Sequence, residues 1–189
     1  MFKVKSDFIC IFKVGDNINY NLKVLALFYK TDSMIKDGTN VLLYKPIIII
    51  IASICEAILY DFHVRIRCNT REGIRNLGAS IINNIRSKKI DEFETYIASA
   101  KKCELFGEKD SKIYIDLDEL RKLRNRIHIQ NKKKYFADDE DIVFTKERKI
   151  MAEEILEKIM KEMLGKYSRP NSVTGYVEDF VIPWDEHIK

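Results

Sequence analysis

The stretch that decides the fold is Ile47-Ile48-Ile49-Ile50-Ile51-Ala52-Ser53-Ile54-Cys55, which continues past Glu56 to Tyr60. Five successive isoleucines are compatible with a buried β-strand. The apolar pattern nevertheless runs on for longer than the five or six residues, roughly, of a common strand. This length favours a buried helix. We predict one long helix over 40–67, with Pro46 in its first turns, where a missing N–H is tolerated.

Helical spacing continues on both sides of this stretch. Glycine and proline are scarce, at seven and three residues, and apolar side chains recur every three to four residues. Such spacing is typical of amphipathic helices. We predict a first helix over 17–30, short helices around 81–85 and over 90–106, and a last long helix that Thr145 caps. One short strand is a candidate over 8–14.

These elements predict an all-α protein, an up-down helical bundle with a packed C-terminal tail. With 189 residues the chain suffices for one domain with a real core. We expect an N-terminal segment with the first helix over 1–39, the bundle over 40–166 and the tail over 167–189. The tail contains the only tryptophan, Trp184, among other apolar residues. We therefore expect it to dock on the bundle.

The charge balance excludes nucleic-acid binding driven by bulk charge. The net charge is only +4, from 33 basic and 29 acidic residues. Any RNA or DNA contact must therefore come from a local patch. The basic run Lys132-Lys133-Lys134 is followed by acidic residues, which fits a solvated loop better than a nucleic-acid clamp.

The cysteines and the apolar runs bear on location and cofactors. Four scattered cysteines without CxxC spacing indicate packing in a reducing cytoplasm rather than disulfides. Histidines and cysteines lack metal-ligand spacing, and no glycine-rich nucleotide motif is present, so we expect no metal and no cofactor.

The isoleucine run is shorter than the roughly 20 residues of a bilayer span. No secretory signal is apparent at the N-terminus, and we expect no membrane association.

A second segment carries the candidate chemistry, Leu117-Asp118-Glu119-Leu120-Arg121-Lys122-Leu123-Arg124-Asn125-Arg126-Ile127-His128. We predict that Asp116 caps a helix here, with the leucines on one face. The polar residues that border this face are Arg121, Arg124, Asn125 and His128. A guanidinium can hold a phosphate with two parallel hydrogen bonds, and an imidazole can take or give a proton. The group is therefore a candidate catalytic site for a phosphodiester.

At these residues the chain resembles the HEPN superfamily of small helical domains. Its motif is an arginine, a polar residue after it, and a histidine beyond four to six intervening residues. Arg124 has the polar successor Asn125 but only three residues before His128, whereas Arg121 has six intervening residues but is followed by Lys122. Either arginine is a candidate for the phosphate. The order of the predicted helices also resembles the HEPN succession over 40–166.

The resemblance implies a homodimer that cleaves RNA without a metal, with arginine and histidine of both subunits meeting at the interface. Such proteins act as toxins or in defence, leave a cyclic 2′,3′-phosphate and can have an antitoxin as partner, although other members have lost catalysis. The competing hypothesis is a non-catalytic helical domain for dimerisation or partner binding. In that case the arginines form ion pairs with Asp118 or Glu119.

Two residues of the long central helix are possible supporting members of the site. Glu56, isolated in an apolar run, either pairs with Arg124 or His128 or reaches solvent. His63 lies near the basic C-terminal end of the same helix. This end either extends a phosphate-binding surface or is an ordinary basic terminus favoured by the helix dipole.

Overall fold

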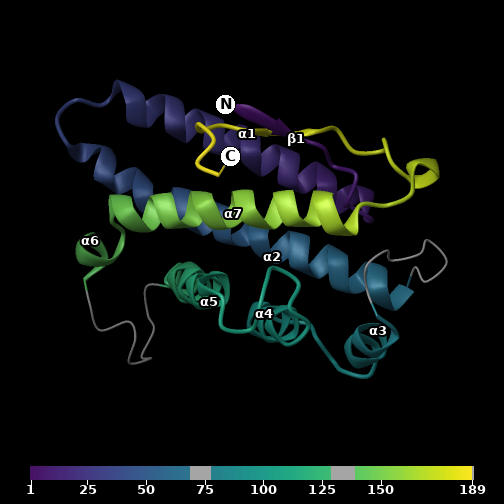
Figure 1. Ribbon diagram of the computed structural model, residues 1–189. Coiled ribbons are helices and arrows are strands. Elements are labelled where there is room, and N and C mark those ends of the chain that lie inside the picture. Colours follow the sequence, from purple (N-terminus) through teal and green to yellow (C-terminus); the bar gives the residue numbers. More distant parts are fainter. Residues whose placement is uncertain (69–77, 129–138, 189) are drawn as a thin grey trace.

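The computed structural model describes residues 1–68, 78–128 and 139–188, and in these parts the chain is mostly helical (Figure 1). The all-α fold predicted from the spacing is confirmed. The basic run at 132–134 lies outside the described residues. The α-helices are α1 (Phe12–Met34), α2 (Tyr44–Cys68), α3 (Ala79–Arg86), α4 (Phe93–Lys102), α5 (Lys112–Asn125), α6 (Glu140–Val143) and α7 (Lys146–Tyr167). Two short 3-10 helices are η1 (Thr39–Leu43) and η4 (Asn171–Val173).

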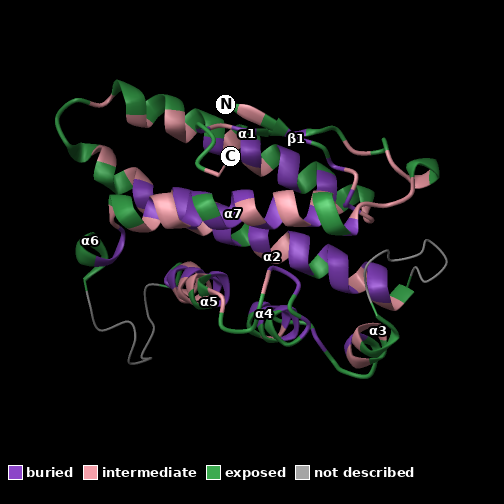
Figure 2. Ribbon diagram, viewed as in Figure 1, coloured by how far each residue is buried: buried purple, intermediate pink, exposed green. Residues whose placement is uncertain are grey.

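Helix α2 lies at the centre of the bundle, between α1 on one side and α4 and α5 on the other, and it also contacts α3 and α7 (Figure 2). The isoleucine stretch is helical, as predicted, and Ile47, Ile51 and Ile58 are buried. Complete burial of such a side chain stabilises the fold by roughly 1.5–3 kcal/mol. Because α2 is apolar around much of its circumference, neighbouring helices are needed on several sides.

The same helix corrects the expectation that the apolar run is too short for a bilayer. By length and composition, the helical segment Thr39–Cys68 would suit a membrane span. Within the fold, 44% of its most apolar window is buried, and α2 contacts five other α-helices among the described residues. A helix in the core of a protein can meet the same criterion of length and composition as a membrane span. The contacts of α2 are those of such a core helix.

The start of α1 differs from the prediction, because the helix begins at Phe12 rather than near residue 17. Phe8–Ile11 is not a strand, so that expectation was wrong. The backbone N–H groups of Cys10 and Ile11 donate to the Asp61 carboxylate of α2, at 2.8 and 2.7 Å. Asp61 thus caps α1 from another helix. Local sequence patterns cannot predict a cap that a residue distant in sequence supplies.

The two strands join the ends of the chain. Strand β1 (Phe2–Val4) pairs antiparallel with β2 (Phe180–Ile182), with Phe2 opposite Ile182. The expected docking of the C-terminal tail is confirmed, because Phe180, Ile182 and Trp184 are buried. The Trp184 ring also packs on Tyr29 of α1, with 5.4 Å between ring centroids.

A buried carboxylate holds the last residues of the tail. Glu157 of α7 is fully buried and accepts the indole N–H of Trp184 at 3.0 Å. It also accepts the backbone N–H groups of His187 and Ile188, each at 3.1 Å. Lys161 lies 3.7 Å from the same carboxylate. A buried charge is tolerated when it is hydrogen-bonded in this way, so Glu157 anchors the tail.

Two helix starts test the predicted caps. Thr145 caps α7 as predicted, since its hydroxyl accepts the backbone N–H of Arg148 at 3.3 Å. The predicted cap at Asp116 is wrong, because α5 already begins at Lys112. Asp116 lies inside the helix and pairs with Lys112 at 2.6 Å. The acidic residue thus serves an i, i+4 ion pair instead of a cap.

Replacing the tail anchor, Glu157→Ala, is expected to release Trp184. The substitution leaves the buried indole N–H of Trp184 and two half-buried backbone N–H groups unpaired, which costs about 2–4 kcal/mol in the free energy of unfolding. Fluorescence of the only tryptophan should shift to longer wavelength before global unfolding. The matched control is Glu154→Ala, an exposed carboxylate on the same helix. An unchanged emission spectrum in Glu157→Ala would contradict this role.

Candidate functional site

Arg124 is held at the junction of α5 and α2. Its guanidinium forms an ion pair with Glu56, so of the two alternatives for Glu56 the structure has the pairing with Arg124. A second, longer hydrogen bond joins Arg124 Nη1 to Asn125 Oδ1 at 3.4 Å. Burial raises the pKa of Glu56, while the neighbouring Arg124 opposes that shift. The Arg124 side chain keeps 34% of its surface exposed, so it is oriented but still accessible.

Arg121 is held differently, although it lies one turn earlier on α5. Its guanidinium contacts Asp118 through Nε and Nη2, at 2.9 and 2.8 Å. Its Nη1 lies 3.2 Å from a Glu94 carboxylate oxygen. Only 11% of the Arg121 side chain is exposed. Two carboxylates therefore occupy this guanidinium, as the ion-pair hypothesis predicted for Asp118.

His128 does not lie on the helix, which corrects the predicted arrangement. Helix α5 ends at Asn125, and the next three residues continue as a turn. The backbone N–H of His128 donates to the Asn125 carbonyl at 3.4 Å, and that of Ile127 to Arg124 at 3.2 Å. Such three-residue bonds satisfy the last carbonyls of a helix. His128 is exposed just past the end of α5.

His63 belongs to the core, so its suggested place in a phosphate-binding surface is contradicted. Its Nδ1 bonds the Leu59 carbonyl at 2.7 Å, and its Nε2 bonds the Ser99 hydroxyl of α4 at 2.9 Å. The ring is buried beside Tyr96. Burial lowers the pKa of His63 to about 4. The neutral imidazole therefore joins α2 to α4.

The basic end of α2 is also structural. Arg65 is fully buried and donates to the carbonyls of Tyr167 and Ser168, the second at 3.3 Å. These are the last carbonyls of α7 and its C-terminal cap residue. A cation at a helix C-terminus is favoured by the helix dipole and by the open carbonyl groups. Arg65 thus ties α2 to α7.

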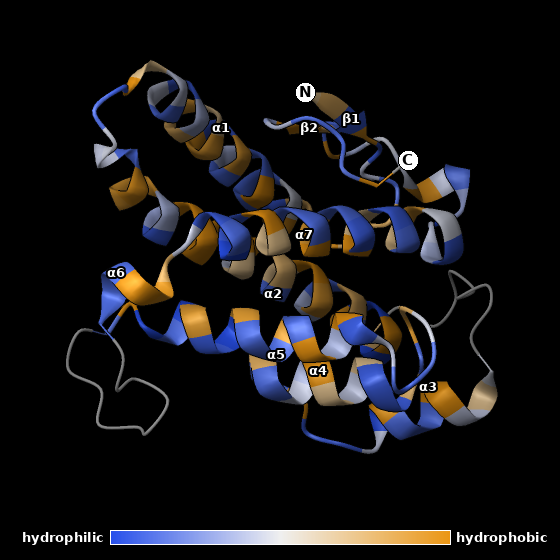
Figure 3. Cartoon of the chain, turned by 60° about the vertical axis from the view of Figure 1, so that its left-hand side comes forward, coloured by the Kyte–Doolittle hydropathy of each residue, from blue (hydrophilic) through white to orange (hydrophobic). Residues whose placement is uncertain are grey.

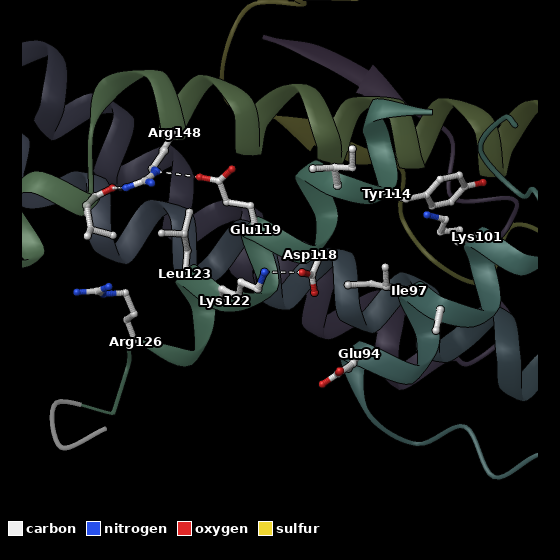
Figure 4. A pocket seen from close by; sticks show the side chains of 13 residues that line it. Glu94, Ile97, Lys101, Tyr114, Asp118, Glu119, Lys122, Leu123, Arg126 and Arg148 are labelled. Atoms are coloured by element: carbon white, nitrogen blue, oxygen red, sulfur yellow. Dashed lines mark hydrogen bonds and ion pairs between the residues drawn. The ribbon is translucent and has the colours of Figure 1, made fainter. Parts of the chain in front are cut away.

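An open groove of about 730 Å³ crosses the outer face of α5, between α4 on one side and α6 and α7 on the other (Figure 4). Its apolar lining includes Ile97, Leu123 and Val143. Its rim is held by ion pairs, Lys122 with Asp118 at 2.7 Å and Arg148 with Glu119 at 2.9 Å. None of the six predicted site residues lines it. The groove and the Arg124 group therefore occupy different faces of α5.

Sequence analysis overlooked the groove, although part of it was visible in the spacing. Ile115, Asp118, Glu119, Lys122 and Arg126 recur at the three- and four-residue steps of one helix face, on the side away from Leu117 and Leu120. What makes this face concave is the position of α4 and α6 beside it. That position depends on packing between segments that are separated in sequence.

Comparison of the chain with protein-family models, curated proteins and solved structures finds no match. The part of the chain that the structure describes contains no cluster of metal-ligating side chains. The geometry therefore defines an all-α bundle with an Arg124–Glu56 pair and an exposed His128 at one end of α5.

The burial of His63 predicts a specific pH dependence of stability. Its folded pKa of about 4 lies below the ordinary value of 6.5, so the unfolded chain binds a proton more readily. The contribution of the neutral His63 ring to the free energy of unfolding is therefore fully present above pH 6.5, and it is lost as the pH falls toward 4. The stability difference between wild type and His63→Gln should shrink by about 2 kcal/mol between pH 7 and pH 5.

Urea unfolding of both proteins at the two pH values measures this change. The comparison with the variant is needed because burial raises the pKa of Asp61 to about 6. Asp61 therefore takes up a proton in the folded state, and its contribution to stability rises as the pH falls over the same interval. A difference between wild type and His63→Gln that stays constant with pH would contradict the assignment.

Proposed function

We propose that this protein acts on RNA and cleaves it without a metal at the C-terminal end of α5. The observation that carries the proposal is the placement of Arg124 and His128. Arg124 is oriented by Glu56 yet accessible, and His128 is exposed four residues past it in the turn. The resemblance of the Leu117–His128 segment to the HEPN motif supports the same function.

The proposed chemistry assigns one role to each side chain. His128 removes the proton of a ribose 2′-hydroxyl, and the resulting oxygen attacks the adjacent phosphorus. Arg124 stabilises the extra negative charge on the phosphoryl oxygens. The 5′-oxygen of the next nucleotide leaves and takes up a proton, so the products carry a 2′,3′-cyclic phosphate and a 5′-hydroxyl. Arg124 is preferred to Arg121 because two carboxylates already occupy Arg121.

The leaving 5′-oxygen needs a proton donor, and we propose that a second copy of the chain supplies this donor. His128 is the only histidine exposed near α5, since His63 is buried in the core. One histidine can act as base while another gives the proton, as general acid–base catalysis requires. We propose a homodimer in the cytoplasm that joins two such sites, with an antitoxin as a possible protein partner.

A second candidate function is a non-catalytic domain that binds a protein partner. The groove on the outer face of α5 favours it, because an apolar lining with a polar rim is typical of binding surfaces. Ile115, which lines this groove, is 65% exposed. In this case Arg121 and Arg124 serve only to hold α5 to its neighbours.

Incubation of the purified protein with structured and single-stranded RNAs in EDTA tests the nuclease. We expect fragments with a 2′,3′-cyclic phosphate and a 5′-hydroxyl, identified by mass spectrometry. His128→Ala and Arg124→Ala should each lower the cleavage rate by about 100-fold or more, because each removes charge stabilisation or proton transfer.

Lys122→Ala is the matched control, since it removes a cation from the opposite face of the same helix. It should leave the rate within a few fold of wild type. Equal cleavage by wild type and His128→Ala, or no cleavage of any RNA by the wild-type homodimer, would exclude the catalytic proposal. The partner-binding function would then stand.

A further inference from the structure

A stripe of apolar residues runs along the outer face of α1. Tyr20, Leu27 and Met34 follow one another at seven-residue intervals and are 68%, 61% and 69% exposed. Val24 and Thr31 lie between them, so the complete series advances by alternating steps of four and three residues. We call these five residues the α1 stripe. This spacing is that of the a and d positions of a coiled coil.

The α1 stripe is not part of the core. The residues of α1 that face the bundle are Ile18, Leu22 and Leu25, which are buried. Helix α1 lies on the side of α2 away from α4 and α5, at the edge of the molecule (Figure 3). The helix is thus apolar on two faces, although one apolar face suffices for a surface helix.

The exposed apolar surface continues past the end of α1. The next element, η1, contacts α1 and exposes Val41 and Leu42. Single exposed apolar side chains are ordinary on protein surfaces, but a continuous row of them marks an interaction site. The exposed apolar residues of α1 and η1, two elements in contact, form such a group around Thr31.

The charges that flank the α1 stripe indicate what could cover it. Lys23 and Lys30 directly precede Val24 and Thr31 and are exposed. Among the described residues, neither lysine forms an ion pair. Acidic residues on this side are Asp16, one turn before Tyr20, and Glu178 of the tail, which borders the same hollow as Lys23. In a coiled coil these flanking positions face the charges of the partner helix, so two unpaired lysines call for acidic residues opposite them.

We infer that the α1 stripe docks an amphipathic helix of another protein, with branched apolar residues at its a and d positions and glutamates or aspartates on its flanks. A second copy of this chain matches the lysines less well, because in an antiparallel pair Lys23 would face another lysine, Lys23 or Lys30 of the copy. In a parallel pair, Lys23 and Lys30 would face Phe28 and Ile35 of the copy. The inference is independent of the proposed RNA cleavage, because α1 contributes no residue to that site.

Two designed peptides test the inference on the full-length protein. Both are about 28 residues long, with leucine at every a and d position, and they carry either glutamate or lysine at every e and g position. The glutamate peptide should bind with a Kd in the micromolar range, more weakly at high salt. The lysine peptide should bind at least about tenfold more weakly. Calorimetry or fluorescence anisotropy measures both affinities.

The charge reversal Lys23→Glu/Lys30→Glu should invert this preference, so that the lysine peptide binds more tightly. Leu27→Glu should abolish binding of the glutamate peptide, because it places a charge inside the apolar seam. The matched control, Ile142→Glu, changes an equally exposed residue on α6 and should not alter binding. Circular dichroism verifies that each variant is folded, and RNA cleavage by Leu27→Glu should equal that of wild type.

Three outcomes would overturn the inference. The first is equal binding of the two peptides, or binding that Leu27→Glu leaves unchanged. The second is a homodimer, detected by light scattering, that Leu27→Glu dissociates, because the stripe would then contact a second copy. The third is binding to phosphatidylserine vesicles that depends on Leu27 in a protein that binds neither peptide. In that case the stripe would be a membrane-contacting surface.

Discussion

The burial of α2 is the constraint on which the rest of the structure depends. Its isoleucine stretch is apolar on several sides, so the other helices pack around it. The few polar residues of α2 then determine how each neighbour is attached. Asp61 caps α1, His63 bonds α4, Arg65 bonds the end of α7, and Glu56 pairs with α5. One apolar helix thus supplies both the core and the specific contacts of the bundle.

The candidate site follows from the last of these contacts. Arg121 and Arg124 are neighbours on one helix, but their surroundings make them different. Two carboxylates on the surface of α4 and α5 hold Arg121, whereas a single carboxylate from the core helix orients Arg124. An arginine with one partner keeps donors for a phosphate, because the guanidinium has five N–H groups. His128 lies in the turn that follows the end of α5 and is exposed.

The molecule presents three distinct surfaces on different sides of α2 and α5. The Arg124 and His128 end of α5 is polar, the outer face of α5 is a groove with an ion-paired rim, and α1 carries an apolar stripe with basic flanks. Because these surfaces use different residues, point substitutions can change each of them separately.

The sequence by itself determined the helical class, the long central helix, the cap at Thr145 and the docking of the tail around Trp184. Those features depend on local spacing and on apolar side chains that must leave water. Only the tertiary structure decided where α1 begins, that the chain ends pair as strands and that His63 is buried. It also decided which arginine remains accessible, that α5 stops before His128 and that α5 borders a groove. The physical reason is that most of these features depend on partners distant in the chain, such as Asp61, Ser99, Glu56 and α4, which come close only when the helices pack around α2.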